Sequence, residues 1–279
     1  MAQRVVEFGA ETNLVGILSQ SSPDQPTAED KFVILLNSGT LHRVGPCRLY
    51  VKLAQHLANI GIASLRFDFS GIGDSNPRSD DLAFHEYSIA EVSSAIDYLS
   101  NGAHPAKIIL LGICSGADTA WYSAINDPRV SAVVLLDGFA HRNLNFYWHH
   151  YKQRIFSTTA WKNFLKSPAN AFAFLAGKPT ADFAANTDEA VFDRDWPDQD
   201  KYSAGLEQLK NQETSLYYIF TGGVRDYLNH PEQFSATYES MQDYDRLSVD
   251  HYPEADHMIS DIGTQRELIE KIGAWAQAI

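Results

Sequence analysis

A cysteine between two glycines is the feature of this sequence that most directly implies chemistry. Residues 112–116 read Gly-Ile-Cys-Ser-Gly; they follow an apolar run typical of a buried strand, residues 107–111, and precede a helix-like run, residues 117–122. A strand, a sharp turn and a helix would hold Cys114 in a strained backbone conformation, with no space for side chains two residues away on either side. We therefore predict that Cys114 is a nucleophile presented at a tight strand-to-helix turn.

A cysteine nucleophile needs a base to form the thiolate, and the base needs a group that orients it. Asp226 follows a predicted strand at residues 215–220, and His257 follows the last predicted strand at residues 247–252. Both side chains are thus expected at the carboxyl ends of strands, where ligands bind in open α/β sheets. The sequence favours a triad of Cys114, Asp226 and His257, in that chain order.

Four alternatives to this triad remain open. Asp137 also follows a predicted strand and could replace Asp226 as the acid. His251, which lies within the last strand, is the alternative base. Ser115 is the alternative nucleophile, although its register lacks the flanking glycines. Cys114 could also be an inert buried thiol, because buried cysteines are common in proteins.

Acyl transfer through such a cysteine requires donors for the developing oxyanion. The backbone N–H of Ser115 would begin the helix after the turn and point at that oxyanion, and the same helix N-terminus would favour the thiolate of Cys114. The second donor is expected from the loop after a predicted strand at residues 31–36. Our candidate for it is the N–H of Thr40.

The same loop continues with three basic side chains, His42, Arg43 and Arg48. In an acidic protein, basic groups beside a reactive cysteine are candidates for binding a carboxylate or phosphate of the substrate. The competing interpretation is that the arginines pair with acids of neighbouring loops such as Asp74. Cys47, in the same loop, is interpreted as a packed thiol.

Composition bounds the partners and the compartment. The chain has 279 residues and a formal net charge of −13, so a nucleic-acid partner is not expected. The two cysteines form no CxxC pair, so we expect neither a disulfide framework nor a metal site, and no cofactor is predicted. The N-terminus lacks a signal-peptide pattern and no apolar run approaches about 20 residues, so we expect no membrane span and a cytoplasmic protein.

Strand and helix patterns alternate along most of the chain, which predicts an α/β fold with a parallel, doubly wound sheet. An edge hairpin is expected at residues 4–8 and 13–20, further strands at 31–36, 63–69, 107–111, 130–136, 215–220 and 247–252, and helices at 47–60, 82–100, 117–122, 232–242 and 264–277.

Residues 139–212 interrupt this alternation. The segment is too long for a simple crossover, is rich in aromatic residues, and contains helical patterns at 143–156 and 159–166. We predict a helical cap over the catalytic face, inserted into an α/β core made of residues 1–138 and 213–279. An inserted structural subdomain without substrate contact is the alternative.

Three stretches resemble a known family. Residues 37–46 (Asn-Ser-Gly-Thr-Leu-His-Arg-Val-Gly-Pro), residues 65–75 (Leu-Arg-Phe-Asp-Phe-Ser-Gly-Ile-Gly-Asp-Ser) and the turn at 112–116 are similar to serine-aminopeptidase-like α/β-hydrolases, closest to the bacterial branch that includes exosortase-associated hydrolases. The resemblance implies the α/β-hydrolase fold and a peptide- or ester-hydrolase activity. Most relatives carry serine at the turn; a cysteine there is similar to dienelactone hydrolases and polyhydroxyalkanoate synthases.

These observations lead to one expected function and two alternatives. We expect a hydrolase that acts on an ester, a lactone or an acyl thioester through a covalent acyl-enzyme, with a small-molecule acyl substrate that is free or bound to coenzyme A or a carrier protein. The first alternative is an acyltransferase or cyclase of a natural-product pathway that uses the same acyl-enzyme. The second is a small-molecule binding module without catalysis, because a fold alone does not prove activity.

Overall fold

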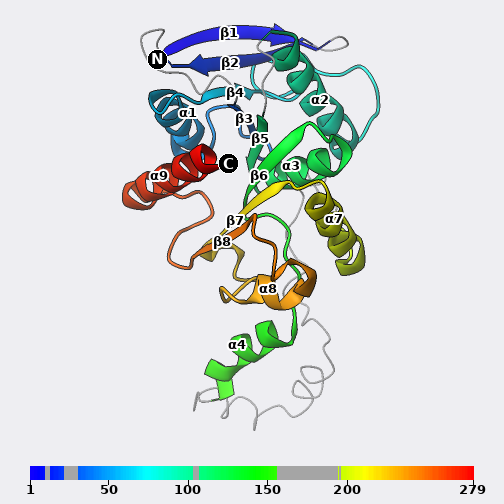
Figure 1. Cartoon of the computed structure of the whole chain (residues 1–279), viewed down its shortest axis with the longest axis vertical. Coiled ribbons are helices and arrows are strands. Elements are labelled where there is room, and N and C mark those ends of the chain that lie inside the picture. The colour runs from blue at the N-terminus through cyan, green and yellow to red at the C-terminus, as the bar shows by residue number, and fades with distance from the viewer. Residues whose placement is uncertain (10–12, 22–30, 103–106, 156–193, 195) are drawn as a thin grey trace.

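Eight strands form one sheet in the order β1-β2-β4-β3-β5-β6-β7-β8 (Figure 1). The structure is a computed structural model, and it describes residues 1–9, 13–21, 31–102, 107–155, 194 and 196–279. The strands are β1 (Ala2–Phe8), β2 (Leu14–Gln20), β3 (Lys31–Leu36), β4 (Ala63–Phe67), β5 (Lys107–Ile113), β6 (Val130–Leu136), β7 (Ser215–Thr221) and β8 (Leu247–Tyr252).

The central strands run parallel and the N-terminal hairpin is antiparallel. β1 pairs with β2 and β2 with β4 in antiparallel register, whereas every pairing from β4 through β3 to β8 is parallel. β3, β5, β6 and β7 are almost completely buried, which matches their continuous apolar sequences and the two-sided covering of a parallel sheet. The carboxyl ends of these strands therefore meet at one edge.

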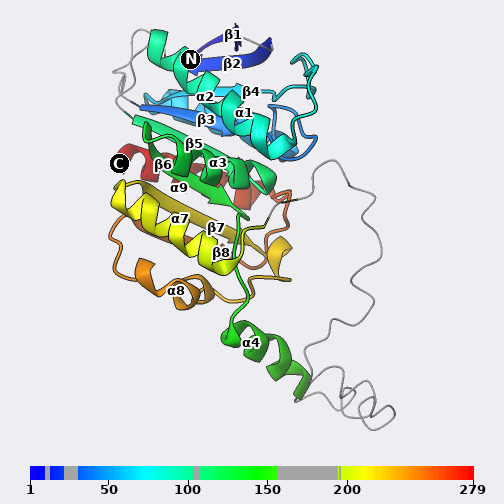
Figure 2. The ribbon, with the colours of Figure 1, turned by 90° about the vertical axis from the view of Figure 1, so that its right-hand side faces the viewer.

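Helices cover both faces of the sheet. α1 (Leu49–Asn59) and α9 (Ile262–Ala278) lie on one face, and α2 (Phe84–Gly102), α3 (Ser115–Asn126) and α7 (Gln199–Asn211) lie on the other (Figures 1 and 2). Side chains on the two sides form two separate core clusters. The expected α/β fold with a mostly parallel, doubly wound sheet is confirmed.

Two predicted helices are shortened or divided in the structure, for a backbone reason in each case. The helix expected at residues 47–60 begins at Leu49, because Cys47 and Arg48 have left-handed backbone and belong to a 3-10 turn, η1 (Pro46–Arg48). The helix expected at residues 232–242 is split into α8 (Gln233–Thr237) and η4 (Glu239–Met241), since Tyr238 between them is not helical.

The predicted cap is described only in part. α4 (Leu144–Ile155) follows β6 and lies beyond the two helical layers in both views (Figures 1 and 2). The helix expected at residues 159–166 lies outside the described residues. α7, which the prediction assigned to the cap, contributes Tyr202, Leu206 and Leu209 to the main core cluster. The division into core and cap remains a prediction.

The helices of the structure are of ordinary globular length. α2 has 19 residues and one acidic side chain, Glu86, in its first turn. No helix in the described part of the chain is both long enough and apolar enough to cross a membrane.

Candidate active site

Cys114 lies between the end of β5 and the start of α3, with a backbone φ of 54° and ψ of −124°. This conformation is strained for any residue with a side chain. A Cβ on Gly112 would lie 2.1 Å from backbone atoms of Gly116, and a Cβ on Gly116 would lie 2.5 Å from the carbonyl oxygen of Asn37. Both flanking glycines are thus required, and the strand-turn-helix prediction for residues 112–116 matches the structure.

The backbone around Cys114 is fixed to its neighbours. Its N–H donates to the carbonyl of Leu136 at the end of β6, over 2.9 Å. Its carbonyl accepts the N–H groups of Ala117 and Asp118, which closes the first turn of α3. Cys114 itself is only partly buried. The turn therefore holds the thiol at the edge where the parallel strands end.

His257 is held by Asp137. Nδ1 of the imidazole lies 2.7 Å from Oδ2 of Asp137, whose side chain is fully buried. The same carboxylate accepts the N–H and the hydroxyl of Thr221, each over 2.7 Å. Asp137 has a φ of 51°, a second left-handed residue directly after a central strand. Three donors therefore fix the acid that orients the imidazole.

The prediction that Asp226 orients His257 is corrected by this contact. Asp226 is exposed, and its recorded hydrogen bond is made by its backbone carbonyl, which accepts Nε of Arg142. The glycines after β7 explain the difference. A Cβ on Gly223 would lie 2.6 Å from Cβ of His257, so the β8 loop rests directly on the β7 loop. His257 thereby passes over β7 and reaches the acid at the end of β6.

The contact between these loops gives a first testable prediction. Alanine at Gly223 is expected to displace His257 from Asp137 and to reduce activity at least about tenfold, because backbone atoms of residue 257 cannot be avoided by a rotamer change. Turnover of an activated ester and the midpoint of thermal unfolding would be measured together. Gly263→Ala is the matched control, since a Cβ there would come closest to a side-chain atom, Oδ2 of Asp261 at 3.0 Å, rather than to backbone atoms. Equal activity in both variants would contradict the prediction.

The thiol and the imidazole favour an ion pair. Burial opposes ionisation of Cys114, but hydrogen bonding with His257 and the charge of Arg194 outweigh it, so the pKa of the thiol is lowered. The hydrogen bond to Asp137, and then the one to Cys114, raise the pKa of His257 to about 10. Both shifts favour thiolate and imidazolium at neutral pH.

Arg194 is a residue that the sequence analysis missed. Its Nε and Nη2 donate to the two carboxylate oxygens of Asp118, over 2.6 and 2.7 Å, and Nη2 lies 3.3 Å from the carbonyl of Asp137. Burial raises the pKa of Asp118 to about 6 against the effect of this arginine. The one signal in the sequence is Asp118 itself, an acid one turn after Cys114 in a helix of small and apolar residues, which calls for a cation.

The two residues expected to donate to the oxyanion, Ser115 and Thr40, lie in different surroundings. Ser115 is the first residue of α3, so its N–H has no partner within the helix. Thr40 is exposed in the turn closed by Leu41 N–H and Ser38 carbonyl. Gly39, the residue before Thr40, reaches the turn at residues 112–116, here called the elbow: its N–H donates to Oγ of Ser115 over 2.7 Å. The contact between the loop and the elbow thus lies one residue before Thr40.

The three basic residues of this loop also have different roles in the structure. Arg43 pairs with Asp68 and Asp74, and its N–H donates to Asp68 over 2.6 Å, so the competing interpretation describes it correctly. His42 is exposed, and its carbonyl accepts the N–H of Gly45. Arg48 is exposed at the start of α1. Arg43 is thereby withdrawn from the set of candidate substrate ligands.

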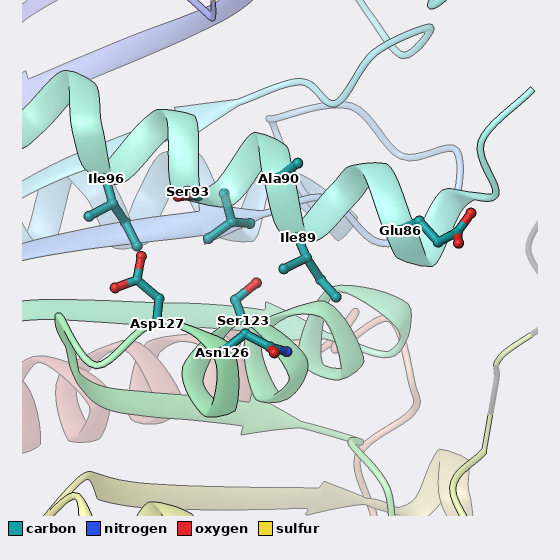
Figure 3. Close-up of a pocket in the computed structure, with 9 residues that line it drawn as sticks. Glu86, Ile89, Ala90, Ser93, Ile96, Ser123, Asn126 and Asp127 are labelled. Carbon is teal, nitrogen blue, oxygen red and sulfur yellow. The ribbon is translucent and has the colours of Figure 1, made fainter. Parts of the chain in front are cut away.

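Two other features could mark a functional site, the alternative base His251 and a surface pocket, and both lie away from Cys114. The alternative base, His251, lies within β8 opposite Phe220, and its buried Nε2 has no hydrogen-bond partner. A pocket between α2 and α3 is lined by Ile89, Ser93 and Asp127, among others (Figure 3). It reaches Asn126 at the end of α3, about 18 Å along the helix from the elbow. The Cys114 thiol, the His257 imidazole and the Asp137 carboxylate lie together at the elbow.

Possible metal ligands are not clustered in the described part of the chain. Within the described ranges, no group of three or more His, Cys, Asp or Glu side chains could hold a metal ion. The groups available at the elbow are a thiol, an imidazole and a carboxylate, and these can perform nucleophilic catalysis by themselves.

Comparison with known proteins supports the description of the fold. A model of the alpha/beta hydrolase fold matches residues 32–248. A search of curated proteins finds no match to this sequence.

Solved structures match over nearly the whole chain. An esterase of Pyrococcus furiosus, Pf2001, is 17% identical with a TM-score of 0.60, covering 99% of this chain and 92% of the esterase. DcsB, solved in complex with its substrate analogue, is 15% identical with a TM-score of 0.57, and 99% of each chain is covered. XC6422 of Xanthomonas campestris, a serine hydrolase without a lid, is 10% identical with a TM-score of 0.57, covering 99% and 94%. At these identities the likeness shows a shared fold.

Proposed function

The chain belongs to the alpha/beta hydrolase fold family, and from this premise we propose that it hydrolyses an ester, a lactone or an acyl thioester through an acyl-enzyme on Cys114. The observation that carries the proposal is the chain of contacts from the Cys114 thiol through His257 to Asp137. This is the nucleophile, base and orienting acid of covalent acyl transfer.

The first half of the reaction forms the acyl-enzyme. The Cys114 proton passes to His257, and the thiolate attacks the carbonyl carbon of the substrate to form a carbon–sulfur bond. The carbonyl oxygen becomes an oxyanion. When the intermediate collapses, the bond to the leaving group breaks and His257 returns the proton to the departing alcohol or thiol. Asp137 keeps the imidazole oriented and stabilises its charged form.

The second half releases the acyl group. A water molecule gives a proton to His257 and attacks the thioester carbon. The carbon–sulfur bond then breaks, the product leaves as a carboxylic acid, and Cys114 regains its proton from His257. Each half therefore uses the imidazole once as base and once as acid.

The oxyanion is held by backbone donors at the elbow. Ser115 N–H begins α3, where the helix dipole also favours negative charge. For the second donor we replace Thr40 with Gly39, whose N–H already lies against the elbow through Ser115 Oγ. In this assignment Gly39 N–H exchanges the serine hydroxyl for the oxyanion of the intermediate.

The thiol nucleophile favours activated acyl groups. The acyl-enzyme is itself a thioester, so exchange with a substrate thioester is nearly thermoneutral, whereas formation from an amide is uphill. Esters, lactones and thioesters are accordingly favoured over peptides.

Intact-mass spectrometry across p-nitrophenyl esters, lactones and acyl thioesters tests the proposed function. We expect a mass increase equal to the acyl group, located on Cys114, followed by its loss in water. Loss only after addition of an alcohol or amine would instead indicate an acyltransferase. Saturable ligand binding with no adduct on any substrate would contradict catalysis and favour a binding module.

The electrostatic effect of Arg194 gives a separate prediction. Arg194→Met removes a cation that lowers the thiol pKa, so the pH midpoint for alkylation of Cys114 by iodoacetamide is expected to rise. Asp118→Asn removes an anion that raises the thiol pKa, so the midpoint is expected to fall. Both variants break the same ion pair, and a shift in the same direction for both would contradict the electrostatic explanation.

A further inference from the structure

Arg66 is a charged residue in the interior of a central strand. It is 7% exposed, and its neighbours in β4, Leu65 and Phe67, are fully buried in the core cluster on the other face. Its backbone is paired with Leu35 of β3, whose side chain belongs to the cluster beneath α1 and α9. Side chains alternate along a strand, so the guanidinium lies on the α1 face of the sheet.

The guanidinium of Arg66 has no ion-pair partner among the described residues. Its buried Nε has no hydrogen-bond partner, and none of the ion pairs among the described residues includes it. Asp68 is the acid whose charge reaches it. That carboxylate is already shared by the backbone and side chain of Arg43 and by Asn37. A buried charge without a partner is unfavourable, so the site favours an added anion.

Two further arginines lie near Arg66, because α1 packs against β4 and Arg48 is the N-cap of α1, while Arg43 bonds to Asp68, two residues after Arg66. The pKa of Arg66 is lowered by burial and by the charges of Arg43 and Arg48, whereas the charge of Asp68 acts to raise it. Arg43 is neutralised by Asp68 and Asp74, whereas Arg48 is exposed at the start of α1 and forms no ion pair with a described residue. Arg48 and Arg66 are thus the two guanidinium groups left to bind an external ligand.

The position of Arg66 connects it with the nucleophile. Leu35 pairs with Leu111 of β5 as well as with Arg66, so Arg66 and Leu111 are two strands apart, about 10 Å. Cys114 follows Leu111 by three residues, about another 10 Å along the chain. We propose that Arg48 and Arg66 form an anion subsite that binds a carboxylate or phosphate group of the acyl substrate, at a distance from its reacting carbonyl.

The chemistry of the two side chains limits the ligand. Guanidinium groups bind carboxylate and phosphate oxygens in pairs, and both arginines together can take one oxyanion from two directions. The anion is carried either by the acyl chain, as in the monoester of a dicarboxylic acid, or by the leaving group, as in a coenzyme A thioester. This inference deepens the proposed function and depends on it for the identity of the ligand as a substrate.

Binding of inorganic phosphate to the full chain carrying Cys114→Ala tests the subsite without turnover. Calorimetric titration is expected to show one saturable site, with affinity reduced about tenfold or more by Arg48→Ala and by Arg66→Met. Arg66→Lys keeps the charge and is expected to bind better than Arg66→Met. Arg246→Ala is the control, since that exposed arginine pairs with Glu213 and should leave binding unchanged.

Kinetics on the active enzyme then identify the source of the anion. Monoesters of dicarboxylic acids would be compared with their neutral diesters, and coenzyme A thioesters with short neutral thioesters. Loss of kcat/KM in Arg48→Ala confined to one anionic series would assign the anion to the acyl chain or to the leaving group. Phosphate binding that is absent, or equal in all variants, overturns the subsite even if acyl-enzyme forms. Phosphate binding without any acyl-enzyme would instead overturn the proposed function and leave the anion site.

Discussion

Alanine in place of Cys114 is expected to abolish the acyl-enzyme and to lower the turnover of activated esters on the order of 10⁴-fold. In the proposed mechanism the thiol at the strained turn is the nucleophile: the imidazole of His257 takes its proton, and the N–H of Ser115 stabilises the oxyanion that its attack creates. Turnover and intact mass would be measured on the same preparations.

Cys47→Ala is the matched control for this prediction. Cys47, interpreted from the sequence as a packed thiol, is instead exposed in the η1 turn before α1, so its removal should leave both readouts unchanged. Cys114→Ser is the graded variant: it keeps a hydroxyl at the elbow but loses the thiolate, and is expected to be slower than the native enzyme. Native turnover by the alanine variant would remove Cys114 from the mechanism.

Asparagine at Asp137 is expected to reduce kcat/KM about 10²-fold or more, while asparagine at Asp226 changes it less than about twofold. Asp137 is the first cause of the raised pKa of His257, so its removal lowers that pKa and makes the thiolate–imidazolium pair less favourable. The pH midpoint of Cys114 alkylation should rise in Asp137→Asn alone.

The pair of asparagine variants separates a catalytic from a structural effect. Thr221 also bonds to the Asp137 carboxylate, so thermal unfolding must be recorded for both variants. A lower unfolding midpoint with an unchanged alkylation profile would mean that Asp137 only supports the loop. A large loss of kcat/KM in Asp226→Asn would instead support Asp226 as the acid, as the sequence favoured.

The fold was predictable because its signals are local. Continuous apolar runs identify β3, β5, β6 and β7, and the two glycines around Cys114 identify the turn that joins β5 to α3. Each signal depends on a few neighbouring residues, and a parallel sheet then follows from the alternation of strands and helices.

The acid was not predictable because it depends on how two loops cross. Asp137 and Asp226 both follow parallel strands, and both are aspartates in loops at the same edge. His257 reaches Asp137 and not Asp226, and Gly223 permits this because it lets the His257 loop lie directly on the loop after β7. A contact between loops 34 residues apart leaves no periodic pattern in the sequence.

Arg66 and Arg194 escaped prediction for a related reason. Arg66 is one charged residue within an apolar strand. Its unpartnered Nε becomes apparent only in the structure, where the nearby Asp68 carboxylate already bonds to Arg43. Arg194 lies 80 residues after Cys114 and approaches it through Asp118, a contact that no spacing indicates.

The left-handed conformations of Cys114 and Asp137 have a consequence for the evolution of this enzyme. Each costs about 1–3 kcal/mol, and both occur at residues whose side chains carry the proposed chemistry. Glycine at Cys114 would relax the backbone but delete the proposed nucleophile, whereas glycine at Asp137 would also remove the carboxylate that accepts two hydrogen bonds from Thr221. The strained conformation of Cys114 therefore lowers stability without any structural return, so a chain that lost the proposed chemistry would be free to replace this residue with an unstrained one.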